Sequence, residues 1–478
     1  MKTSIAVGRR AKIVCTMGPS TQTEERIEAL IEAGMNVARL NFSHGSHEDH
    51  GRMLEMIRSV SARMRQPIAV LQDLQGPKIR VGKFENGGVP LVPGAPFRLV
   101  TETMLGNETM ASVSYDLIWQ DVHPGDSILL DDGLLHLEVT ATGEGWVDTV
   151  VVVGGTLKDR KGINLPNTPV SIPSLTPKDR EDLEWGIKAG VDYIALSFVR
   201  SALDIHQLRS LLPRGEDSPE IIAKIEKPQA VSNLREIVMA SDGIMVARGD
   251  LGVEMPPEQV PIIQKQAIAL AMSLGKISIT ATQMLDSMTF NPRPTRAEAS
   301  DVANAVFDGT DAVMLSGETA SGKYPIEAVA FMDRIVREAE ASPFLKHGPQ
   351  QLSTTEIRPF SHAIAKAAAI AAEELNVNAI CCFSTSGRTP RLIKTFRPSK
   401  LIVSFTPSRS TYNRAALCWG THPVLCELRT ETDALIAQVE KTMIAEQLCD
   451  HGRHVIIVLG VPVGRGTPTN MIKFHTIP

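Results

Sequence analysis

The sequence is poor in aromatic residues and cysteines, and it has no long apolar run. Aromatic residues make up 4% of the chain, and its six cysteines include no Cys-x-x-Cys pair. We therefore expect reduced thiols and a cytoplasmic protein rather than a disulfide framework. Apolar runs such as Val455–Val458 with its neighbours are shorter than the roughly 18 residues of a membrane span. The first residues also lack the apolar segment and cleavage site of a signal peptide.

An excess of charge of one sign is also missing. The formal net charge is −5 and no basic block occurs, so we expect neither nucleic acid nor an anionic membrane as a partner. A net-acidic protein can still bind an anionic substrate if its cations gather in one pocket. The chain has 478 residues, of which 43% are hydrophobic. This length exceeds one ordinary core, and two or three domains are expected.

Short apolar runs alternate with amphipathic segments that end at glycine. These segments end at Gly34, Gly190, Gly275 and Gly309, as expected where a left-handed residue terminates a helix. Most of the runs are nearly continuous in Val, Ile, Leu and Ala, which is typical of parallel strands covered by helices. The eight runs are Ile13–Thr16, Val37–Phe42, Ile68–Asp73, Tyr193–Phe198, Ile221–Glu226, Ile244–Asp250, Ile277–Thr282 and Ala312–Ser316.

Eight such strands with helical crossovers predict an α/β fold, the (β/α)₈ TIM barrel, with an active site at the C-terminal ends of the strands. An open, doubly wound sheet is the alternative, but no glycine-rich dinucleotide-binding turn follows the first strand. Two helix starts are marked as well. Thr21 with Glu24 has the composition of an N-cap, and so has Thr176 with the following Pro177 and Asp179.

The barrel pattern is interrupted once and ends before the C-terminus. Residues 76–171 are rich in Gly, Pro and Val, which predicts an inserted all-β lid domain, a small β-barrel, on the active-site face. Residues 1–75 and 172–345 would then form the barrel. Residues 346–478, with a predicted helix at His362–Leu375, would form a C-terminal α/β domain. Strands outside the barrel are predicted at 97–101, 127–130, 134–140, 147–153, 379–383, 401–405, 424–428, 455–459 and 471–477.

Charged side chains occur at the ends of two predicted strands. Lys224 and Glu226 are two residues apart and should face the same side, and the same holds for Arg248 and Asp250. Glu226 and Asp250 supply the hard oxygen ligands that Mg²⁺ prefers, and Lys224 adds a positive charge. This combination describes a site for an anionic substrate chelated to a divalent cation, as phosphoryl transfer requires. Further polar residues at predicted strand ends are Arg39, Asn41, Ser43, Asp73 and Thr282.

The structural alternative is a salt-bridge network that plugs the barrel. Barrel interiors normally consist of branched aliphatic side chains, and burying so much charge without a function is costly. We therefore prefer the functional interpretation.

Three weaker features have both a functional and a structural interpretation. His44 and His47 are potential ligands, although a capping or surface role is the commoner one. Lys178 lies inside a predicted helix N-terminus and could be a solvated charge. The loop at 384–389 (STSGRT) follows a predicted strand and opens a helix, as phosphate-binding loops do, but such loops are common in α/β domains.

Around these residues the chain resembles the pyruvate kinase family. Its family-specific motifs occur in the family's order, and the domain plan agrees over essentially the whole chain. The motifs are ARLNFSHG (38–45), LQDLQGPKIR (71–80), IIAKIEK (221–227), DGIMVARGDLGVE (242–254), ATQMLDSM (281–288), PTRAEASDVANAV (294–306) and MLSGETASGKYP (314–325).

The resemblance implies a Mg²⁺-dependent enzyme, with Mn²⁺ as a substitute, that moves a phosphoryl group from phosphoenolpyruvate to ADP and yields pyruvate and ATP. Lys224 would be the main catalytic cation, and Glu226 and Asp250 would hold the metal ion. Thr282 would be linked to protonation of the enolate, and Arg39 would bind the phosphate. The remaining implied substrate contacts are Ala247, Arg248 and Gly249 together with Asp250 and Thr282.

One departure from the family pattern concerns the monovalent cation. Many members have Thr directly after the Asp of the third strand and Glu five residues after that Asp, and they need K⁺; this chain has Leu74 and Lys78. We predict that the Lys78 ammonium replaces K⁺ and that no potassium is required, whereas otherwise Lys78 is a surface charge at the lid hinge. The family's monovalent-cation position would be lined here by Asn41, Ser43 and Asp73.

The resemblance further implies that His44, Arg80 and Lys178 contact the nucleotide. The C-terminal domain would bind a phosphorylated allosteric activator, a sugar phosphate or AMP. A homotetramer is implied, and the lack of a helical segment before the barrel fits bacterial, K⁺-independent members. The residues implied for the effector are Ser384, Thr385, Ser386, Arg388, Thr389, Arg465 and Gly466.

Two other functions stay open at the level of the sequence. A Mg²⁺-dependent aldolase or lyase on pyruvate-type enolates would need the same carboxylates and cation, but not a β-rich lid, nucleotide contacts or an effector domain. A catalytically silent metabolite sensor would use only the C-terminal loop. The joint presence of Lys224, Glu226, Asp250 and Thr282 argues against the sensor.

Overall fold

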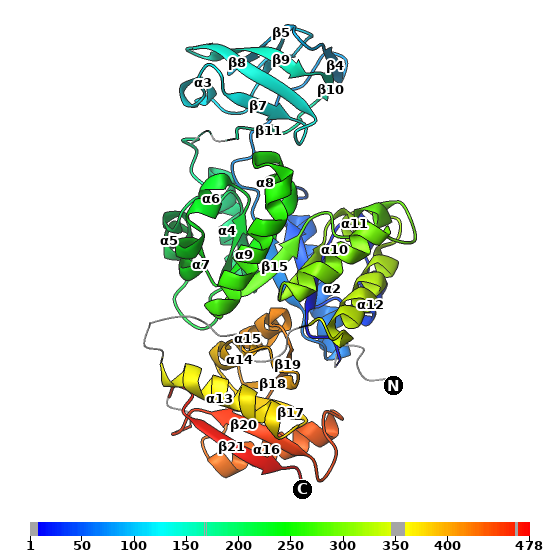
Figure 1. The fold of residues 1–478 in the computed structure, drawn as a ribbon, viewed down its shortest axis with the longest axis vertical. Coiled ribbons are helices and arrows are strands. Elements are labelled where there is room, and N and C mark those ends of the chain that lie inside the picture. Colours follow the sequence, from blue (N-terminus) through cyan, green and yellow to red (C-terminus); the bar gives the residue numbers. More distant parts are fainter. Residues whose placement is uncertain (1–7, 167, 169, 346–358, 464–466) are drawn as a thin grey trace.

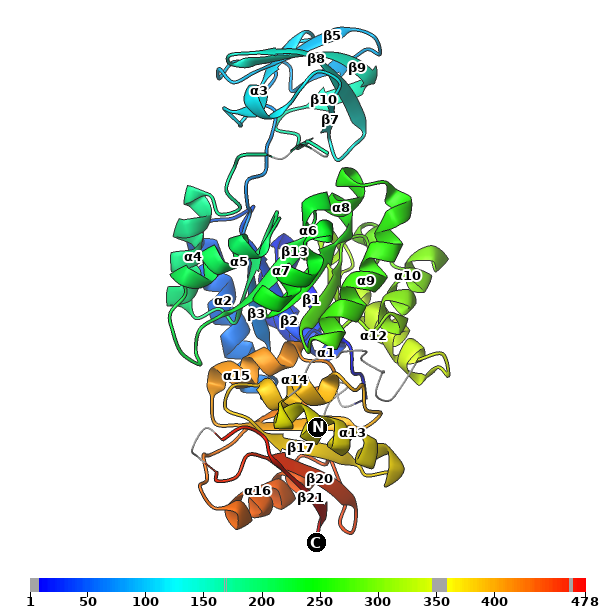
Figure 2. The ribbon, with the colours of Figure 1, turned by 60° about the vertical axis from the view of Figure 1, so that its left-hand side comes forward.

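The computed structural model describes residues 8–166, 168, 170–345, 359–463 and 467–478. Figures 1 and 2 show three parts stacked along the long axis of the molecule. A β-rich part (cyan) lies at one end, the barrel lies in the middle, and the C-terminal α/β part (yellow to red) lies at the other end.

Eight parallel strands close into a barrel in the order β1-β16-β15-β14-β13-β12-β3-β2. The predicted TIM barrel is therefore confirmed, and the open sheet is excluded. Alternation explains the packing, since Val14 and Leu71 fill the interior whereas Ile13 and Val70 contact the surrounding helices. The strands are β1 (Lys12–Thr16), β2 (Val37–Asn41), β3 (Ala69–Asp73), β12 (Tyr193–Leu196), β13 (Glu220–Ile225), β14 (Gly243–Ala247), β15 (Ile277–Ala281) and β16 (Ala312–Leu315).

Helices surround this barrel, and the glycines predicted to end four of them do so. Gly34, Gly190, Gly275 and Gly309 all have positive φ and follow the last helical turns. The helices of the barrel part are α1 (Glu24–Ala33), α2 (His47–Met64), α4 (Pro177–Ala189), α5 (Ala202–Leu211), α6 (Pro228–Ser232), α7 (Leu234–Ala240), α8 (Arg248–Glu254), α9 (Val260–Ser273), α10 (Arg296–Phe307), α11 (Gly317–Ala320) and α12 (Pro325–Ala341).

One of the two predicted N-caps is correct. Thr176 caps α4 in a capping box with Asp179. The prediction for Thr21 is wrong, because α1 is capped by Thr23, whose side chain accepts a hydrogen bond from the Arg26 amide. The Thr21 hydroxyl instead donates to the carbonyl of Gly18 and closes a preceding 3₁₀ turn. Two threonines near a helix start compete for the cap, and the earlier one is used by the turn.

The inserted segment forms a six-stranded sheet in the order β11-β7-β8-β9-β5-β6 and a separate pair, β10-β4. Isolated bridges such as Arg80–Gly162 and Val81–Val113 join further segments of this part, and its description as a small β-barrel stays a prediction. Its core contains Phe97 and Leu137. The elements are β4 (Gly88–Leu91), β5 (Pro96–Val100), β6 (Met110–Ser112), α3 (Ile118–Asp121), β7 (Ser127–Leu130), β8 (Leu135–Gly143), β9 (Trp146–Val153), β10 (Gly155–Lys158) and β11 (Ile163–Asn164).

The C-terminal part is a five-stranded sheet in the order β19-β18-β17-β20-β21, covered on both faces. Ile380 contacts the apolar side of α13, whereas Cys381 contacts that of α16. Only β21 is antiparallel to its neighbour. The elements are α13 (Phe360–Glu374), β17 (Ala379–Phe383), α14 (Arg388–Lys394), β18 (Leu401–Thr406), α15 (Arg409–Arg414), β19 (Thr421–Leu425), α16 (Thr432–Ala445), β20 (His454–Leu459) and β21 (Met471–Thr476).

The strand predicted at 424–428 begins three residues earlier, at Thr421. Pro423 lies inside it, and proline lacks the N–H that an inner strand must donate. Because β19 is at the edge of the sheet and pairs only with β18, the missing donor is tolerated.

The domain limits at residues 75, 171 and 345 stay predictions, although each sheet lies within one of the predicted domains. All six cysteines are free, as expected. Among the helices of the described residues, none has the length and apolar character needed to cross a membrane.

Candidate functional site

Lys224 is the centre of a buried charged cluster inside the barrel mouth. Its Nζ lies 2.9 Å from Glu226 Oε1 and 3.3 Å from Asp73 Oδ1, and it donates to the Ser197 hydroxyl at 2.7 Å. Lys224 belongs to β13 and Glu226 follows that strand, so the predicted pair does face one side. Asp73 comes from the end of β3, two strands away in the barrel.

Arg39 of β2 completes this cluster. Its Nε donates to Asp73 Oδ2 at 2.7 Å, and its Nη1 donates to the Thr16 hydroxyl at 3.0 Å. The structure thus brings together four of the polar strand-end residues that the sequence singled out. Arg39 and Lys224 together place two positive charges at the barrel mouth, where an anionic substrate would bind.

The pKa values reflect this mutual neutralisation. Burial opposes charge on Lys224, but the carboxylates of Asp73 and Glu226 outweigh it and raise the pKa of Lys224 above its ordinary value. Asp73 is buried too, yet Lys224 and Arg39 lower its pKa. Burial raises the pKa of Glu226, and the nearby Asp250 carboxylate adds to that rise against the opposing effect of Lys224.

Asp250 is not on a strand, which corrects the sequence prediction for 244–250. Strand β14 ends at Ala247, and residues 248–254 form helix α8. The apolar run Ile244–Ala247 continues into Arg-Gly-Asp without a turn signal, so the boundary was invisible in the pattern. Asp250 lies in the first turn of α8, where the helix dipole favours a carboxylate.

The donor set fits one divalent cation. Glu226 and Asp250 are close enough to repel each other electrostatically, and a cation between them would relieve that repulsion. Two carboxylates leave the other positions of Mg²⁺ for water and substrate oxygens. Within the described residues, no group of three or more His, Cys, Asp or Glu side chains could hold a metal ion on its own, so water or substrate oxygens would supply the remaining ligands.

Thr282 has a strained backbone directly after β15. Its φ is 68° and that of Gln283 is 53°, both in the left-handed region that β-branched and bulky residues avoid. The Thr282 hydroxyl accepts a hydrogen bond from the Gly249 amide at 2.7 Å and donates to the carbonyl of Ala281. The hydroxyl is therefore held at a fixed position beside α8.

Arg248 stabilises this strained turn. Its guanidinium donates to the carbonyls of Ala281 and Thr282 and lies 2.7 Å from the Asp301 carboxylate. The sequence suggested that Arg248 and Asp250 face the same side. The Arg248 side chain instead runs along the strand ends. Of the substrate contacts implied by the resemblance, Gly249 and Thr282 are joined by a hydrogen bond, and the buried Ala247 directly precedes α8.

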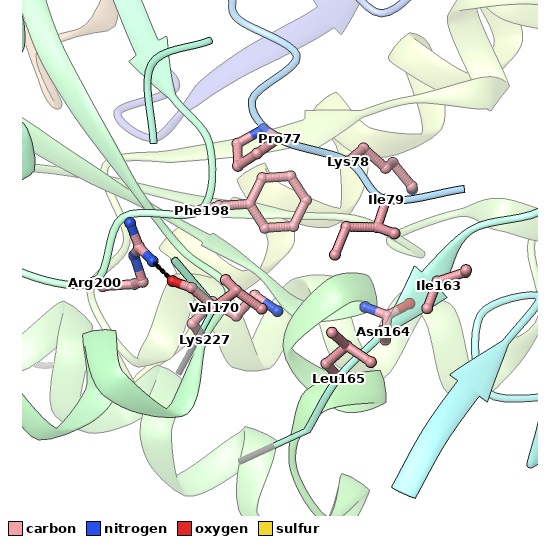
Figure 3. Close-up of a pocket in the computed structure, with 10 residues that line it drawn as sticks. All are labelled: Pro77, Lys78, Ile79, Ile163, Asn164, Leu165, Val170, Phe198, Arg200 and Lys227. Atoms are coloured by element: carbon pink, nitrogen blue, oxygen red, sulfur yellow. Dashed lines mark hydrogen bonds between the residues drawn. The ribbon is translucent and has the colours of Figure 1, made fainter. Parts of the chain in front are cut away.

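Lys78 lies on the linker from β3 to the inserted domain. In the part of the chain that the structure describes, its Nζ pairs with Asp250, at 4.0 Å, and not with Asp73. Asn41 accepts a hydrogen bond from the amide of Ser43. Lys78 also lines a cavity between the linkers and the barrel loops (Figure 3).

The residues implied for the nucleotide come from three places. The exposed His44 contributes its carbonyl to a hydrogen bond with His50. Lys178 donates to the carbonyl of Phe42 and pairs with Asp182. Arg80 lies on the inserted domain, where it donates to the carbonyl of Arg160. Hydrogen bonds do not join His44, Lys178 and Arg80 to one another among the described residues.

The loop after β17 opens α14 as predicted. Thr385 donates to the carboxylate of Glu216, a barrel residue, and Thr389 bonds to Thr469 at 2.8 Å. Ser386 lines a cavity whose walls include Arg391 and Arg414. Arg388 begins α14 and Ser384 is the first residue after β17, whereas Arg465 and Gly466 lie outside the described residues.

Sequence reasoning missed three residues around this site: Ser197, Glu254 and Asp301. Ser197 had a signal, because it is a polar residue at the end of a predicted strand. Glu254 and Asp301 lie on helices, where a single acidic residue is indistinguishable from a surface charge.

Comparison with known proteins gives a consistent result over the whole chain. Residues 8–329 match the family model "Pyruvate kinase, barrel domain", and residues 362–475 match "Pyruvate kinase, alpha/beta domain". The pyruvate kinase of Geobacillus stearothermophilus is 46% identical over 472 residues, which cover 98% of this chain and 80% of that protein. The pyruvate kinase of Sporosarcina psychrophila is 45% identical with the same coverage. A crystal structure of a pyruvate kinase from Cryptosporidium parvum has a TM-score of 0.91, with 36% identity, and covers 98% of this chain and 97% of that one.

Proposed function

This chain belongs to the pyruvate kinase family, and on that basis we propose that it transfers a phosphoryl group from phosphoenolpyruvate to ADP without a need for K⁺ and under allosteric control. The observation that carries the reaction is the cluster of Lys224, Asp73 and Glu226 at the barrel mouth, with Asp250 beside it. Such a site offers positioned charge rather than a nucleophile, as a loose phosphoryl transition state requires.

In this mechanism Lys224 neutralises the phosphoryl group in flight, because its raised pKa keeps the ammonium charged. Arg39 binds the phosphate oxygens and is oriented by Asp73 and Thr16. Glu226 and Asp250 would hold the Mg²⁺ ion. When bound, Mg²⁺ supplies Lewis-acid stabilisation of the developing enolate and phosphate charge.

The enolate left by transfer needs one proton at carbon. The Thr282 hydroxyl, fixed by the Gly249 amide, lies at the strand end where that proton would be delivered. The backbone from Ala247 to Gly249 opens α8 and would contact the substrate carboxylate beside Thr282.

We assign the monovalent-cation role to Lys78. Its ammonium approaches Asp250 from the linker, and a permanent charge in the barrel mouth would make a bound K⁺ redundant, so that Asn41, Ser43 and Asp73 would not serve as K⁺ ligands.

The nucleotide would lie between barrel and lid, contacted by His44 and Lys178 on the barrel and Arg80 on the inserted domain. The effector would bind at Ser384–Thr389 and residues 465–466. The hydroxyl-bearing loop and the nearby Arg391 and Arg414 would suit a phosphoryl group. A cytoplasmic homotetramer completes the proposal, and light scattering of the purified protein tests that assembly.

The first experiment measures pyruvate formation from phosphoenolpyruvate and ADP with Mg²⁺, in potassium-free buffer and then with added K⁺. We expect full turnover without K⁺ and a loss of about 10²–10³-fold in kcat for Lys224→Met. Turnover that appears only with K⁺ would keep the kinase and discard the role of Lys78. No turnover in either buffer would favour the aldolase or sensor functions.

The effector proposal needs its own measurement. We expect a sugar phosphate or AMP to lower the phosphoenolpyruvate concentration at half-saturation, and Thr385→Ala with Ser386→Ala to abolish that shift. If no phosphorylated metabolite shifts the saturation curve of the unaltered protein, this part of the proposal is wrong.

A further inference from the structure

One carboxylate joins the inserted β domain to the barrel behind the proposed metal site. Glu254 Oε1 accepts hydrogen bonds from the Asn164 side-chain amide at 2.8 Å and from the Lys227 ammonium at 2.5 Å. The side chain of Glu254 is only 1% exposed. Asn164 belongs to the inserted domain and Lys227 to the barrel, so Glu254 ties the two parts together.

Glu254 shares a helix face with one proposed metal ligand. Asp250 and Glu254 are four residues apart on α8, which places them on the same side, one turn apart. Because α8 is short, a shift of Glu254 is transmitted directly to Asp250. The inserted domain also approaches α8 next to Glu254, since a β-carbon at Gly133 would lie 3.6 Å from the Val253 side chain.

The second proposed ligand is linked through Lys227, which directly follows Glu226. The Lys227 ammonium lies 5.6 Å from the centre of the Phe198 ring. The Phe198 amide in turn donates to Glu226 Oε2 at 2.9 Å. Glu254 therefore contacts Lys227, the residue next to Glu226. Through α8 it is also linked to Asp250.

Asn164 is fixed to the inserted domain and moves with it. It lies on β11, which pairs with β7 in the six-stranded sheet. Figure 3 shows its side-chain amide and the Lys227 amino group pointing toward the same space, at the cavity between linkers and barrel. A rotation of the sheet about these linkers must move Asn164 relative to Lys227.

A contact that only holds the inserted domain against the barrel would not need a buried carboxylate. Removing a carboxylate from water costs several kcal/mol, and well-packed apolar residues often serve adhesion better. In addition, Glu254 Oε2 is buried without a hydrogen-bond partner among the described residues, a feature that requires an explanation in a native structure.

We propose that Glu254 is a positioning residue that couples the inserted domain to Asp250 and Glu226, so that lid position and divalent-cation affinity depend on each other. The proposal rests on the assignment of these two carboxylates as the Mg²⁺ ligands. Since coupling is reciprocal, metal binding also biases the lid. Residues that orient metal ligands typically change metal affinity about 10–100-fold when they are altered.

The test is Mn²⁺ binding measured by electron paramagnetic resonance, with no substrate present. We expect Glu254→Gln, which keeps the shape but removes the charge, to raise the Mn²⁺ dissociation constant about tenfold. Asn164→Ala leaves the Lys227 contact in place and is expected to raise it by a smaller factor. Asn164→Ala also decides the matter if Glu254→Gln does not fold.

Arg200→Lys is the matched control. Arg200 ties the returning linker to the barrel through the carbonyls of Val170 and Ile172, without contacting Glu254. The Mn²⁺ affinity of Arg200→Lys should equal that of the unaltered protein. If Arg200→Lys and Asn164→Ala weaken Mn²⁺ binding equally, the cause is a general loosening of the hinge, and the coupling is overturned. The coupling is also overturned if Glu254→Gln or Asn164→Ala binds Mn²⁺ with the affinity of the unaltered protein.

The failure of this inference differs from that of the proposed reaction. If the unaltered protein binds Mn²⁺ but makes no pyruvate, the reaction is wrong while the variants still decide the coupling. If the unaltered protein makes pyruvate and the variants bind Mn²⁺ normally, only the coupling is wrong. An unaltered protein that binds no Mn²⁺ refutes the coupling as well.

Discussion

Single residues in the barrel mouth stay charged although they are buried, and burial disfavours a charged side chain. Lys224 has two carboxylate neighbours, and Asp73 lies between Lys224 and Arg39. Each ion is therefore neutralised by at least one buried partner, which offsets part of the desolvation cost. A change of any one of these residues leaves an unpaired charge, so the cluster must be altered with isosteric substitutions.

Arg248→Lys tests the strained turn at this scale. A lysine cannot reach the carbonyls of Ala281 and Thr282 and the carboxylate of Asp301 together, so Thr282 should relax from its left-handed conformation. A displacement of about 1 Å can reduce kcat about 10²-fold. Steady-state kinetics should show that fall with little change in KM for phosphoenolpyruvate. A rise in KM alone would support the substrate contact implied by the family resemblance instead.

His50 makes stability depend on pH. Burial lowers the pKa of His50 below its ordinary 6.5, against the opposing effect of the bond to the His44 carbonyl. As the pH falls through about 6.5, the unfolded chain binds the proton first, so this residue reduces stability at low pH. The melting temperature of the unaltered protein should therefore fall more steeply than that of His50→Gln between about pH 7.5 and about pH 5.5. Parallel curves would contradict this prediction.

At the scale of elements, α4 illustrates how a local signal can organise a distant site. Thr176 and Asp179 form its capping box, and the Asp179 carboxylate also accepts a hydrogen bond from the Gly76 amide on the lid linker. Lys178 lies in the same first turn, so the cap positions both the linker and a proposed nucleotide contact.

Thr176→Ala should lower the free energy of unfolding of this part by about 1 kcal/mol. Because Lys178 would be held less firmly, KM for ADP should rise as well. Thr23→Ala removes the cap of α1, far from the nucleotide residues, and should cost similar stability without changing KM. If both variants change KM for ADP equally, the cap of α4 has no specific effect on the nucleotide site. Urea unfolding and kinetics check both expectations.

At the scale of the whole molecule, the C-terminal domain closes the bottom of the barrel. Ala416 and Leu417 join the hydrophobic cluster inside the barrel. Lys394 pairs with Asp311 just before β16, and both side chains are buried. Arg391 pairs with Glu220, the first residue of the strand that carries Lys224. The proposed effector loop is therefore one helix away from the strand that carries Lys224.

Lys394→Met tests this junction. Among the residues that the structure describes, it leaves the buried Asp311 carboxylate with only Arg397 as a charged partner, and breaking a buried pair typically costs about 3–5 kcal/mol. A clear fall in the melting temperature is expected. Arg63→Met breaks an exposed pair with Glu24 and should leave the melting temperature unchanged. A tolerated Lys394→Met would mean that Arg397 compensates fully.

The parts that could be predicted from the sequence have local causes. The barrel strands, the glycine helix ends and the Thr176 cap follow from patterns a few residues long. The start of α8 could not be predicted, because no turn residue separates it from β14. The contact between Asn164 and Glu254 spans 90 residues, and neither residue carries a local sign of it.

The eight-stranded barrel, the inserted and C-terminal segments, the family and the charged residues at the strand ends follow from the amino-acid sequence, because hydrophobic periodicity and long motifs are properties of neighbouring residues. Three contacts emerge only in the folded molecule: Arg248 supports Thr282, Glu254 joins the inserted domain to the barrel, and Arg391 reaches the strand that carries Lys224. These depend on where the chain returns in space, since a buried charge takes as its partner whichever opposite charge the fold brings within reach.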